Sequence, residues 1–255
     1  MNFITPKMPN DMKLKVTGFA SAFDAGTLIP SHSHSAHQIA HAISGTMRVS
    51  VHNKMWFIPP GRALWITAQT PHAIQCVGPV EMRTAYLSEA YPPVYADAAV
   101  ISVSPLMREV LVRLAGGDDS DLSLMLADVL VHEIRQGLSE PLHLPIPSNP
   151  HIAELAQHLQ NEPADQSTLR TWAKRMGFSE RNLIRTIRAE TGMTFRELRR
   201  LTRIMIAIEK LSAGQSVTKT AFDVGYETPS AFTHAFRTLI GCSPLRFQSG
   251  RECHT

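Results

Sequence analysis

The sequence predicts a two-domain fold, in which an N-terminal all-β barrel with a helical hairpin precedes an all-α domain of two repeated helical units joined by a long helix. Three observations predict it. The length of 255 residues exceeds the usual size of one domain. Short alternating apolar runs fill the first third of the chain, and a helical repeat lies near its end. The hydrophobic fraction of 44% supplies enough apolar side chains for two cores.

Residues 13–87 have the pattern of a small barrel. Short apolar or alternating runs such as "TMRVSVH", "KMWFIPP" and "ALWITA" are separated by Gly, Pro, Asn and Ser. Alternation places every second side chain on one face of a strand, and frequent turn residues keep the strands short. This pattern is typical of a sandwich or barrel of many strands.

Helical spacing replaces the strand pattern from Ser104 onward. Apolar side chains recur every three or four residues on both sides of "AGGDDSD", which predicts two amphipathic helices in a hairpin. These side chains are Leu106, Val110, Leu111, Leu114, Leu122, Met125, Leu126, Val129, Leu130 and Ile134. Two interpretations stay open: the apolar faces pack on the barrel, or they meet a second copy of the chain and form a homodimer.

Composition changes at "PLHLPIPSNP", residues 141–150, which contain four prolines. Proline interrupts helices and central strands and stiffens a connector, so this segment is predicted to link domains at 1–140 and 151–250. Residues 1–147 carry 10 Lys and Arg against 12 Asp and Glu, whereas residues 148–255 carry 15 against 10. The basic second half is therefore the one expected to meet a polyanion.

The second half contains an internal repeat. "LRTWAKRMGFSERNLIRTIRAETG" (169–192) and "VTKTAFDVGYETPSAFTHAFRTLIG" (217–241) share a small residue four positions before a glycine, an aromatic residue after it, and a closing glycine. These positions are Ala173, Gly177, Phe178 and Gly192 in the first copy and Ala221, Gly225, Tyr226 and Gly241 in the second. A small residue lets two helices cross closely and glycine permits a tight turn, as in a helix-turn-helix unit.

The second helix of each unit is predicted to begin at a capping hydroxyl, Ser179 or Thr228. In a helix-turn-helix unit this recognition helix lies on the outside and enters a DNA major groove. Its predicted DNA-contacting residues are Ser179, Arg181, Asn182, Arg185 and Arg188 in the first unit and Thr228, Ser230, Thr233, His234 and Arg237 in the second. Arginine forks onto guanine and asparagine onto adenine, whereas Ser and Thr mostly hold phosphates.

One long helix is predicted between the repeats, in "TFRELRRLTRIMIAIEKLSAG". Its buried face is predicted to consist of Leu198, Leu201, Met205, Ile208 and Leu211. Such a helix would let the two recognition helices enter successive major grooves, about 34 Å apart. Its basic residues, Arg196, Arg199, Arg200 and Arg203, either contact phosphates or form an ordinary solvated face.

Residues 152–247 resemble the DNA-binding domain of the AraC/XylS family of bacterial transcription regulators. The resemblance rests on "WAKRMGFSERNLIRTIRAETGMTF" and, more closely, on "VTKTAFDVGYETPSAFTHAFRTLIGCSPLRF". It implies a sequence-specific regulator of promoter DNA, with RNA polymerase as a partner if the protein is an activator. Two positions depart from the family pattern: Ile187 replaces a common phenylalanine, and His234 replaces a frequent arginine, which weakens the contact expected there.

Residues 15–90 resemble the cupins, which are small β-barrels. Two motifs carry the resemblance: Gly26-x5-His32-x-His34-x3-Gln38-x6-Gly45, and "WITAQTPHAI" with His72 at the ligand position. Gln38 stands at the usual glutamate position of the first motif, and Gln69 replaces the usual glycine of the second. The resemblance implies an effector-sensing, cupin-like domain ahead of the DNA-binding one.

The cupin-like histidines suit a metal. His32 and His34 are two residues apart on a predicted strand, so both are expected to face the barrel interior, and His72 is expected to come from a facing strand. Three imidazoles with the Gln38 oxygen fit one divalent ion such as Zn, Ni, Fe or Mn. The alternative is a pocket without metal that holds a small-molecule effector by hydrogen bonds.

Two more histidines have a weaker case as ligands. His37 is opposite in parity to His34 and is expected to face outward, and His41 is expected to be a polar strand residue. The favoured function is a transcription regulator whose cupin domain senses a small molecule or metal. The alternative is a metal-dependent cupin enzyme carrying a DNA-binding module, against which stand Gln38 and the lack of another evident acid–base pair.

The sequence also bears on location. It has no apolar run of about 18 residues and no apolar leader with a cleavage site, so neither membrane association nor secretion is expected. Cys76, Cys242 and Cys253 are an odd number without CxxC spacing, and they are expected to be free thiols. A cytoplasmic protein is therefore predicted.

Overall fold

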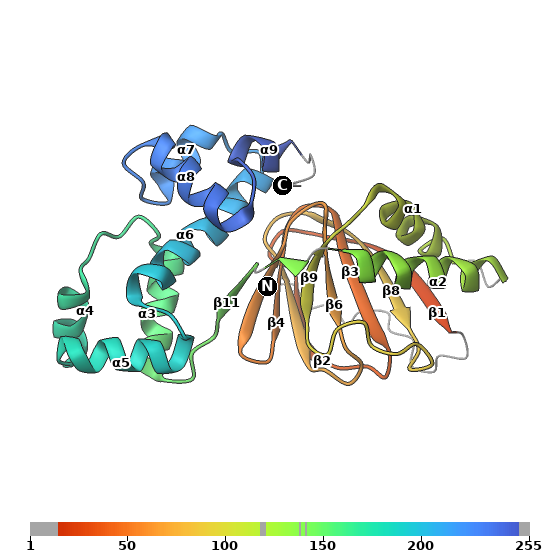
Figure 1. Cartoon of the computed structure of the whole chain (residues 1–255), viewed down its shortest axis with the longest axis horizontal. Helices are drawn as coiled ribbons and strands as arrows, with labels where there is room; N and C mark the ends of the chain where they lie inside the picture. The colour runs from red at the N-terminus through yellow and green to blue at the C-terminus, as the bar shows by residue number, and fades with distance from the viewer. Residues whose placement is uncertain (1–14, 118–120, 138, 141, 250–255) are drawn as a thin grey trace. The chain divides into compact units, whose positions relative to one another are not determined.

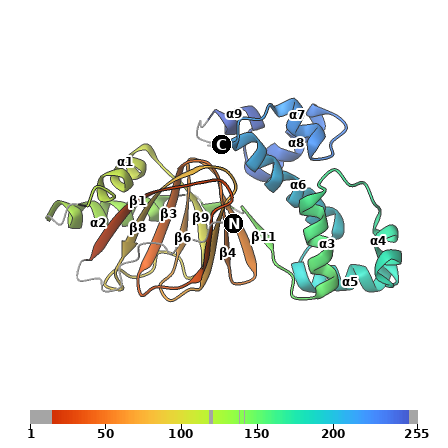
Figure 2. The same cartoon turned by 180° about the vertical axis from the view of Figure 1, so that it is seen from behind.

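The computed structural model describes residues 15–117, 121–137, 139–140 and 142–249 (Figures 1 and 2). The chain folds into two compact units, residues 1–52 with 56–142, and residues 53–55 with 143–255. Strands are the main regular structure of the first unit, and helices are that of the second. The predicted succession of an all-β, cupin-like barrel and an all-α domain is therefore confirmed.

The strands form two sheets whose described pairs are antiparallel. The six-stranded sheet has the order β1 (Val16–Phe23), β8 (Val80–Leu87), β3 (His37–Ser44), β6 (Arg62–Ile66), β9 (Ala99–Ser102) and β10 (Ser139–Glu140). The five-stranded sheet has the order β11 (His143–Pro145), β5 (Lys54–Ile58), β4 (Met47–Val51), β7 (His72–Cys76) and β2 (Leu28–His32). Strands β1 to β8 correspond to the region that the sequence predicted to be a barrel.

Strand β11 lies inside the proline-rich segment 141–150. It occupies the edge of its sheet and ends at Pro145. An edge strand tolerates a proline because part of its backbone forms no ladder hydrogen bonds. Proline content therefore did not reveal that this segment supplies a strand.

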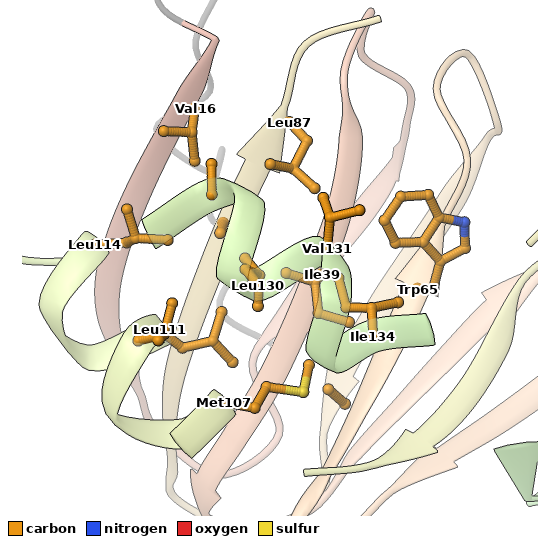
Figure 3. Close-up of a cluster of buried hydrophobic side chains, with 14 of the residues drawn as sticks. Val16, Ile39, Trp65, Leu87, Met107, Leu111, Leu114, Leu130, Val131 and Ile134 are labelled. Carbon is orange, nitrogen blue, oxygen red and sulfur yellow. The ribbon is translucent and has the colours of Figure 1, made fainter. Parts of the chain in front are cut away.

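Two helices, α1 (Pro105–Leu114) and α2 (Asp121–Gln136), form the predicted hairpin and pack on the six-stranded sheet (Figure 3). Met107, Leu111, Leu114, Leu130, Val131 and Ile134 of the helices join Val16, Ile39, Trp65 and Leu87 of the strands in one buried cluster. Burying this apolar surface is the main force that holds the hairpin against the sheet. The interpretation that the hairpin packs on the barrel is therefore confirmed.

Part of the same hairpin stays outside that core. Leu106 is 54% exposed, Leu122 42%, Leu124 38% and Met125 64%. Leu122 and Met125 are three residues apart and so lie on one side of α2. A group of large exposed apolar side chains is a feature of contact surfaces, so the hairpin has apolar surface beyond what covers the sheet.

The second unit contains helices α3 (Pro150–Asn161), α4 (Leu169–Met176), α5 (Glu180–Thr191), α6 (Phe195–Ser212), α7 (Val217–Asp223), α8 (Pro229–Ile240) and α9 (Pro244–Gln248). Each begins at a Ser, Thr or Asn side chain that accepts a backbone N–H of the first turn. Helix α6 is the predicted long helix, and its predicted apolar face is buried.

Each half of the repeat has its own core. The first consists of Ile152, Leu155, Leu159, Trp172, Ala173, Leu183, Ile187 and Leu198. In the second, ring centroids lie 5.5 Å apart for Tyr226 and Phe232, 5.7 Å for Phe232 and Phe236, and 5.5 Å for Phe236 and Phe247. Helix α6 packs against α5 and against α8, so it links the two cores.

The cysteines differ from one another. Cys76 is a free thiol, and burial raises its pKa to about 11. Cys242 is disulfide-bonded, so the expectation of a free thiol is wrong there, because sequence spacing does not report proximity in three dimensions. Cys253 lies outside the described residues. Within the described ranges, no helix has the length and apolar character needed to cross a membrane.

Candidate effector site and nucleic-acid interface

Three of the predicted ligands, His32, His34 and His72, form one cluster. Ring centroids are 4.3 Å apart for His32 and His72, 5.1 Å for His34 and His72, and 6.1 Å for His32 and His34. One ring nitrogen of each lies within 4.8 Å of those of the other two. Three imidazole nitrogens at such spacing are close enough to share one ion.

The three histidines converge by a route that the sequence did not predict. His32 ends β2, but His34 lies in the loop before β3, so the two are not neighbours on one face of a strand. His72 is the cross-strand partner of His32 in the same sheet and does not come from a facing strand. A register shift between Ile29 and His32 marks the irregular end of β2, where the chain turns towards His34.

Each of these rings has its Nδ1 beside a backbone carbonyl. The Nδ1 to oxygen distances are 2.8 Å from His32 to Pro30, 2.7 Å from His34 to Ala36 and 2.9 Å from His72 to Thr70. A carbonyl only accepts, so Nδ1 carries the hydrogen and Nε2 of the neutral ring keeps a lone pair. The His72 Nε2 is buried without a hydrogen-bond partner among the described residues, so its lone pair can serve a metal ion.

Gln38 reaches the cluster from β3 in the other sheet. Its Oε1 lies 3.1 Å from His34 Nε2. Its Nε2 donates to Thr84 Oγ1 at 3.1 Å and to the Tyr86 hydroxyl oxygen at 3.3 Å. The Thr84 hydroxyl donates in turn to the Ile39 carbonyl at 3.1 Å, so its oxygen is left to accept from Gln38. This chain fixes the amide with its oxygen towards His34.

With the hydrogen of His34 on Nδ1, the His34 Nε2 and the Gln38 Oε1 both offer lone pairs at 3.1 Å, and a cation between them would remove the repulsion. A proton on His34 is disfavoured, because burial lowers its pKa, and burial also lowers the pKa of His72 to about 4. Two ligands of one metal ion normally lie about 3.0–3.4 Å apart. The residues present thus fit a divalent metal.

Histidines 37 and 41 lie outside this cluster, as expected, but both are buried. His37 is 4% exposed and stacks on Trp65, with ring centroids 5.1 Å apart, and its Nδ1 accepts from the Ala68 N–H at 3.0 Å. His37 was expected to face outward and to be exposed. It does lie on the opposite face of β3 from Gln38, but it is buried there beside Trp65, a residue of the core under the helical hairpin. His41 on β3 places Nδ1 2.8 Å from the Arg62 carbonyl.

The turn before His72 holds the His34 loop in place. The Gln69 N–H donates to the His34 carbonyl at 2.8 Å. Gln69 has a φ of +62°, the left-handed region that favours glycine. The glycine usual at this position of the cupin motif adopts such a φ without strain. Gln69 adopts it with some backbone strain.

Gln69→Gly is expected to stabilise the N-terminal unit by about 0.5–1 kcal/mol, because relief of left-handed strain exceeds the added entropy of the unfolded chain. Urea unfolding followed through the first unit measures the change. Gln69→Ala keeps the left-handed strain and serves as the control, for which no stabilisation is expected. A glycine variant no more stable than the alanine variant would show that the turn is not strained.

In each half of the repeat, two helices are joined by a turn at a glycine. Gly177 between α4 and α5 has a φ of +69°, and Gly225 between α7 and α8 has a φ of +82°. Ala173 and Ala221 at the crossings are 2% and 0% exposed. The small residues and glycines thus stand where close packing and left-handed turns require them.

Helix α5 presents its predicted DNA-contacting residues on one exposed side. Arg181, Arg185 and Arg188 are exposed, and Asn182 is partly exposed. Ser179 caps the helix by accepting the Asn182 N–H at 3.2 Å. The Arg185 Nη2 donates to Asn182 Oδ1 at 3.0 Å, so the asparagine orients the arginine before any DNA is bound.

Helix α8 has a less basic exposed side. Ser230, His234 and Arg237 are exposed, and Thr233 is partly exposed. Thr228 caps the helix by accepting the Ala231 N–H at 3.2 Å. With one arginine against three on α5, this helix offers fewer charge-assisted contacts to phosphates or guanine.

Two of the four arginines on α6 have structural partners. The Arg203 Nε donates to the Pro163 carbonyl at 2.8 Å, and its Nη2 donates to the Asp165 carbonyl at 3.1 Å. The Arg199 Nη2 donates to the Ser167 carbonyl. Through these hydrogen bonds Arg199 and Arg203 brace the loop before α4, and burial lowers the pKa of both guanidinium groups. Arg196 and Arg200 are exposed.

Sequence reasoning missed Thr84 and Ile184 beside these sites, and it treated Tyr86 as an aromatic more typical of the core than of the cavity. Thr84 and Tyr86 orient Gln38. They are two residues apart on β8, which predicts that both side chains lie on one face of that strand, but the sequence did not show that β8 pairs with β3. Ile184 on α5 is 49% exposed beside Arg185. An exposed apolar side chain on a recognition helix can contact a thymine methyl group, so its presence between charged residues was a signal too.

Comparison with known proteins identifies a domain family in each half of the chain. Residues 172–250 match the helix-turn-helix domain family, and residues 21–87 match the cupin domain family. The HTH-type transcriptional regulator NimR of Escherichia coli is 30% identical over 222 residues, which cover 86% of this chain and 81% of NimR. The HTH-type transcriptional regulator RipA of Corynebacterium glutamicum is 35% identical over 107 residues, 42% of this chain and 32% of RipA.

Among solved structures, ToxT from Vibrio cholerae aligns over 93% of this chain and 99% of its own, with a TM-score of 0.41 and 10% identity. The family matches and the NimR alignment define a DNA-binding transcription regulator with a cupin domain. The chain belongs to the AraC/XylS family of helix-turn-helix regulators.

Proposed function

We propose that the cupin domain holds one divalent metal ion, and that a small-molecule effector bound there changes the affinity of the helical domain for promoter DNA. His32, His34, His72 and the Gln38 oxygen would hold the ion, for which Zn, Ni, Fe and Mn are the candidates. The observation that carries the proposal is the cluster of His32, His34 and His72, whose ring nitrogens lie within 4.8 Å of one another, with the Gln38 Oε1 3.1 Å from the His34 Nε2. The metal would supply a Lewis-acid position at which an effector binds.

In this proposal residues 1–140 sense the effector, residues 141–150 connect, and residues 151–250 bind DNA in the cytoplasm, where promoters lie. The DNA-contacting residues are Ser179, Arg181, Asn182, Arg185, Arg188, Thr228, Ser230, Thr233, His234 and Arg237. Their exposure on α5 and α8 supports this assignment. The effector can act only through a difference in affinity for two states of the protein, so it must contact the two states differently.

The protein is further proposed to act as a homodimer through the helical hairpin. Leu106 and Met125 are 54% and 64% exposed although the same helices have a buried face. Covering such side chains with a second copy would remove apolar surface from water. RNA polymerase would be a partner if the protein is an activator.

Metal content of the purified full chain tests the proposal. We expect about one equivalent of a divalent metal in the wild type and none in the His32→Ala/His72→Ala variant, because one imidazole and one amide do not hold such an ion tightly. Plasma mass spectrometry after extensive dialysis gives the content. Promoter affinity measured with and without a chelator then shows whether the ion affects DNA binding.

His132→Ala is the matched control, since His132 is an exposed histidine on α2 outside the cluster, and its metal content should equal that of the wild type. Thermal unfolding checks that the double variant is folded. A wild type that stays metal-free after supplementation of the growth medium, or a double variant that keeps its metal, would contradict the metal site.

A further inference from the structure

The cluster in the cupin domain consists of neutral groups. His32, His34 and His72 supply imidazoles, and Gln38 supplies an amide oxygen where the resembling motif has a carboxylate. No Asp or Glu of the described ranges belongs to the cluster. A divalent ion held by these groups therefore keeps both of its positive charges.

The surroundings provide little solvent to compensate that charge. His72 and Gln38 are each 1% exposed, Thr84 and Tyr86 are each 2% exposed, and His34 is 9% exposed. Only His32 is partly exposed, which leaves one side of the cluster open to solvent. A charge in such a place is unfavourable unless a counter-charge comes with it.

We infer that the effector is a small organic anion that coordinates the metal through a carboxylate oxygen and so supplies the negative charge missing at Gln38. This inference rests on the metal site of the proposed function and names the ligand class of that site. An oxygen anion is a ligand that these metals accept together with imidazole. Because Gln38 is neutral, the site is expected to bind an anionic effector more tightly than a neutral one of the same shape.

Tyr86 provides a second contact for such an anion. Its hydroxyl oxygen accepts from Gln38 Nε2 at 3.3 Å, which leaves its own hydrogen to donate to another group. Its ring packs edge-on against His34, with centroids 4.9 Å apart. A tyrosine hydroxyl is a donor as well as an acceptor, so this hydrogen can be donated to the second carboxylate oxygen.

Binding of acetate and acetamide to the full chain loaded with Co²⁺ tests this inference. The two probes have nearly the same shape and differ in charge, and the visible absorption of Co²⁺ reports a change of its ligands. We expect acetate to bind at least about tenfold more tightly than acetamide, because only acetate neutralises the ion. Inorganic phosphate is the third probe and is expected to bind more weakly than acetate.

Two variants separate charge from hydrogen bonding. Gln38→Glu places a carboxylate in the cluster, so acetate affinity should fall at least about tenfold while metal content is kept. Tyr86→Phe removes the hydroxyl, and acetate affinity should fall about tenfold. Thr84 still accepts from Gln38 Nε2 at 3.1 Å and holds the amide, so the metal should be kept. Metal content and thermal unfolding of each variant check that the site and the fold are intact.

The outcomes distinguish this inference from the metal site itself. A protein that takes up no Co²⁺ would contradict both. Equal affinities for acetate and acetamide in protein with about one equivalent of Co²⁺ would contradict only the anion. Tighter binding of phosphate than of acetate would contradict the inference that the effector is a carboxylate. An acetate affinity that does not fall in Gln38→Glu would show that charge compensation is not the reason for binding.

Discussion

Gly225→Ala is expected to lower the free energy of unfolding of the helical domain by about 3 kcal/mol. Gly225 has a φ of +82°, and a Cβ there would lie 2.7 Å from the Ala164 Cα and 2.8 Å from the Arg203 Nη2. Backbone strain and overlap with a neighbouring backbone therefore act together. Urea or thermal unfolding of the full chain, followed through the helical unit, measures the loss.

The overlap falls on a junction that joins the two halves of the repeat. The Arg203 guanidinium donates to the Pro163 and Asp165 carbonyls, and the Gln166 Nε2 donates to the Gly225 carbonyl at 3.0 Å. Displacing either the loop or the guanidinium removes hydrogen bonds from half-buried groups. DNA affinity should fall as well, since the junction connects the α7–α8 turn with the loop before α4.

Gly177→Ala is the matched control. Gly177 holds the equivalent turn position in the first half of the repeat with a φ of +69°, but a Cβ there would meet nothing within 4 Å. Only backbone strain should appear, about 1 kcal/mol. If both variants lost the same stability, the close approach at Gly225 would contribute nothing and the account of the junction would be wrong.

The helical domain was largely predictable because its signals are local. Ser179, Thr228, Gly177 and Gly225 each act within one turn of their own position, and the structure uses them as caps and turns. Local signals do not show what a long side chain reaches. Arg203 looked like a solvated or phosphate-binding residue, yet it donates to a loop about forty residues earlier in the chain.

The sequence pattern predicted the strands of the barrel, but it did not predict which strands pair or in which register. The residue types of the cluster were correct, whereas the positions assumed for His34 and His72 were not, because spacing of two implies one strand face only if the strand continues. Gln38 is paired with Tyr86 across strands 48 positions apart in sequence. No local pattern specifies such a pair, so the contacts that orient Gln38 needed the structure.

Arg185→Ala is expected to weaken binding to the specific promoter site by about 1–3 kcal/mol and to relax specificity at one base pair. Arg185 is exposed on α5, and the Asn182 Oδ1 accepts from its Nη2 at 3.0 Å, which fixes the guanidinium in advance. A preorganised fork loses less entropy when it pairs with guanine. Affinities for the footprinted site and for random duplex of equal length, at one salt concentration, give the specificity ratio.

Arg113→Ala controls for the loss of one positive charge, because Arg113 is an exposed arginine on α1 in the other unit, and its specificity ratio should match that of the wild type. The pattern of loss decides which contact Arg185 makes. A loss confined to the specific site means that the guanidinium reads a base edge, whereas an equal loss on both duplexes means that it holds a phosphate. If affinity fell on neither duplex, the DNA-contacting face would lie elsewhere on α5. The hydrogen bond from Arg185 to Asn182 would then have no role in DNA recognition.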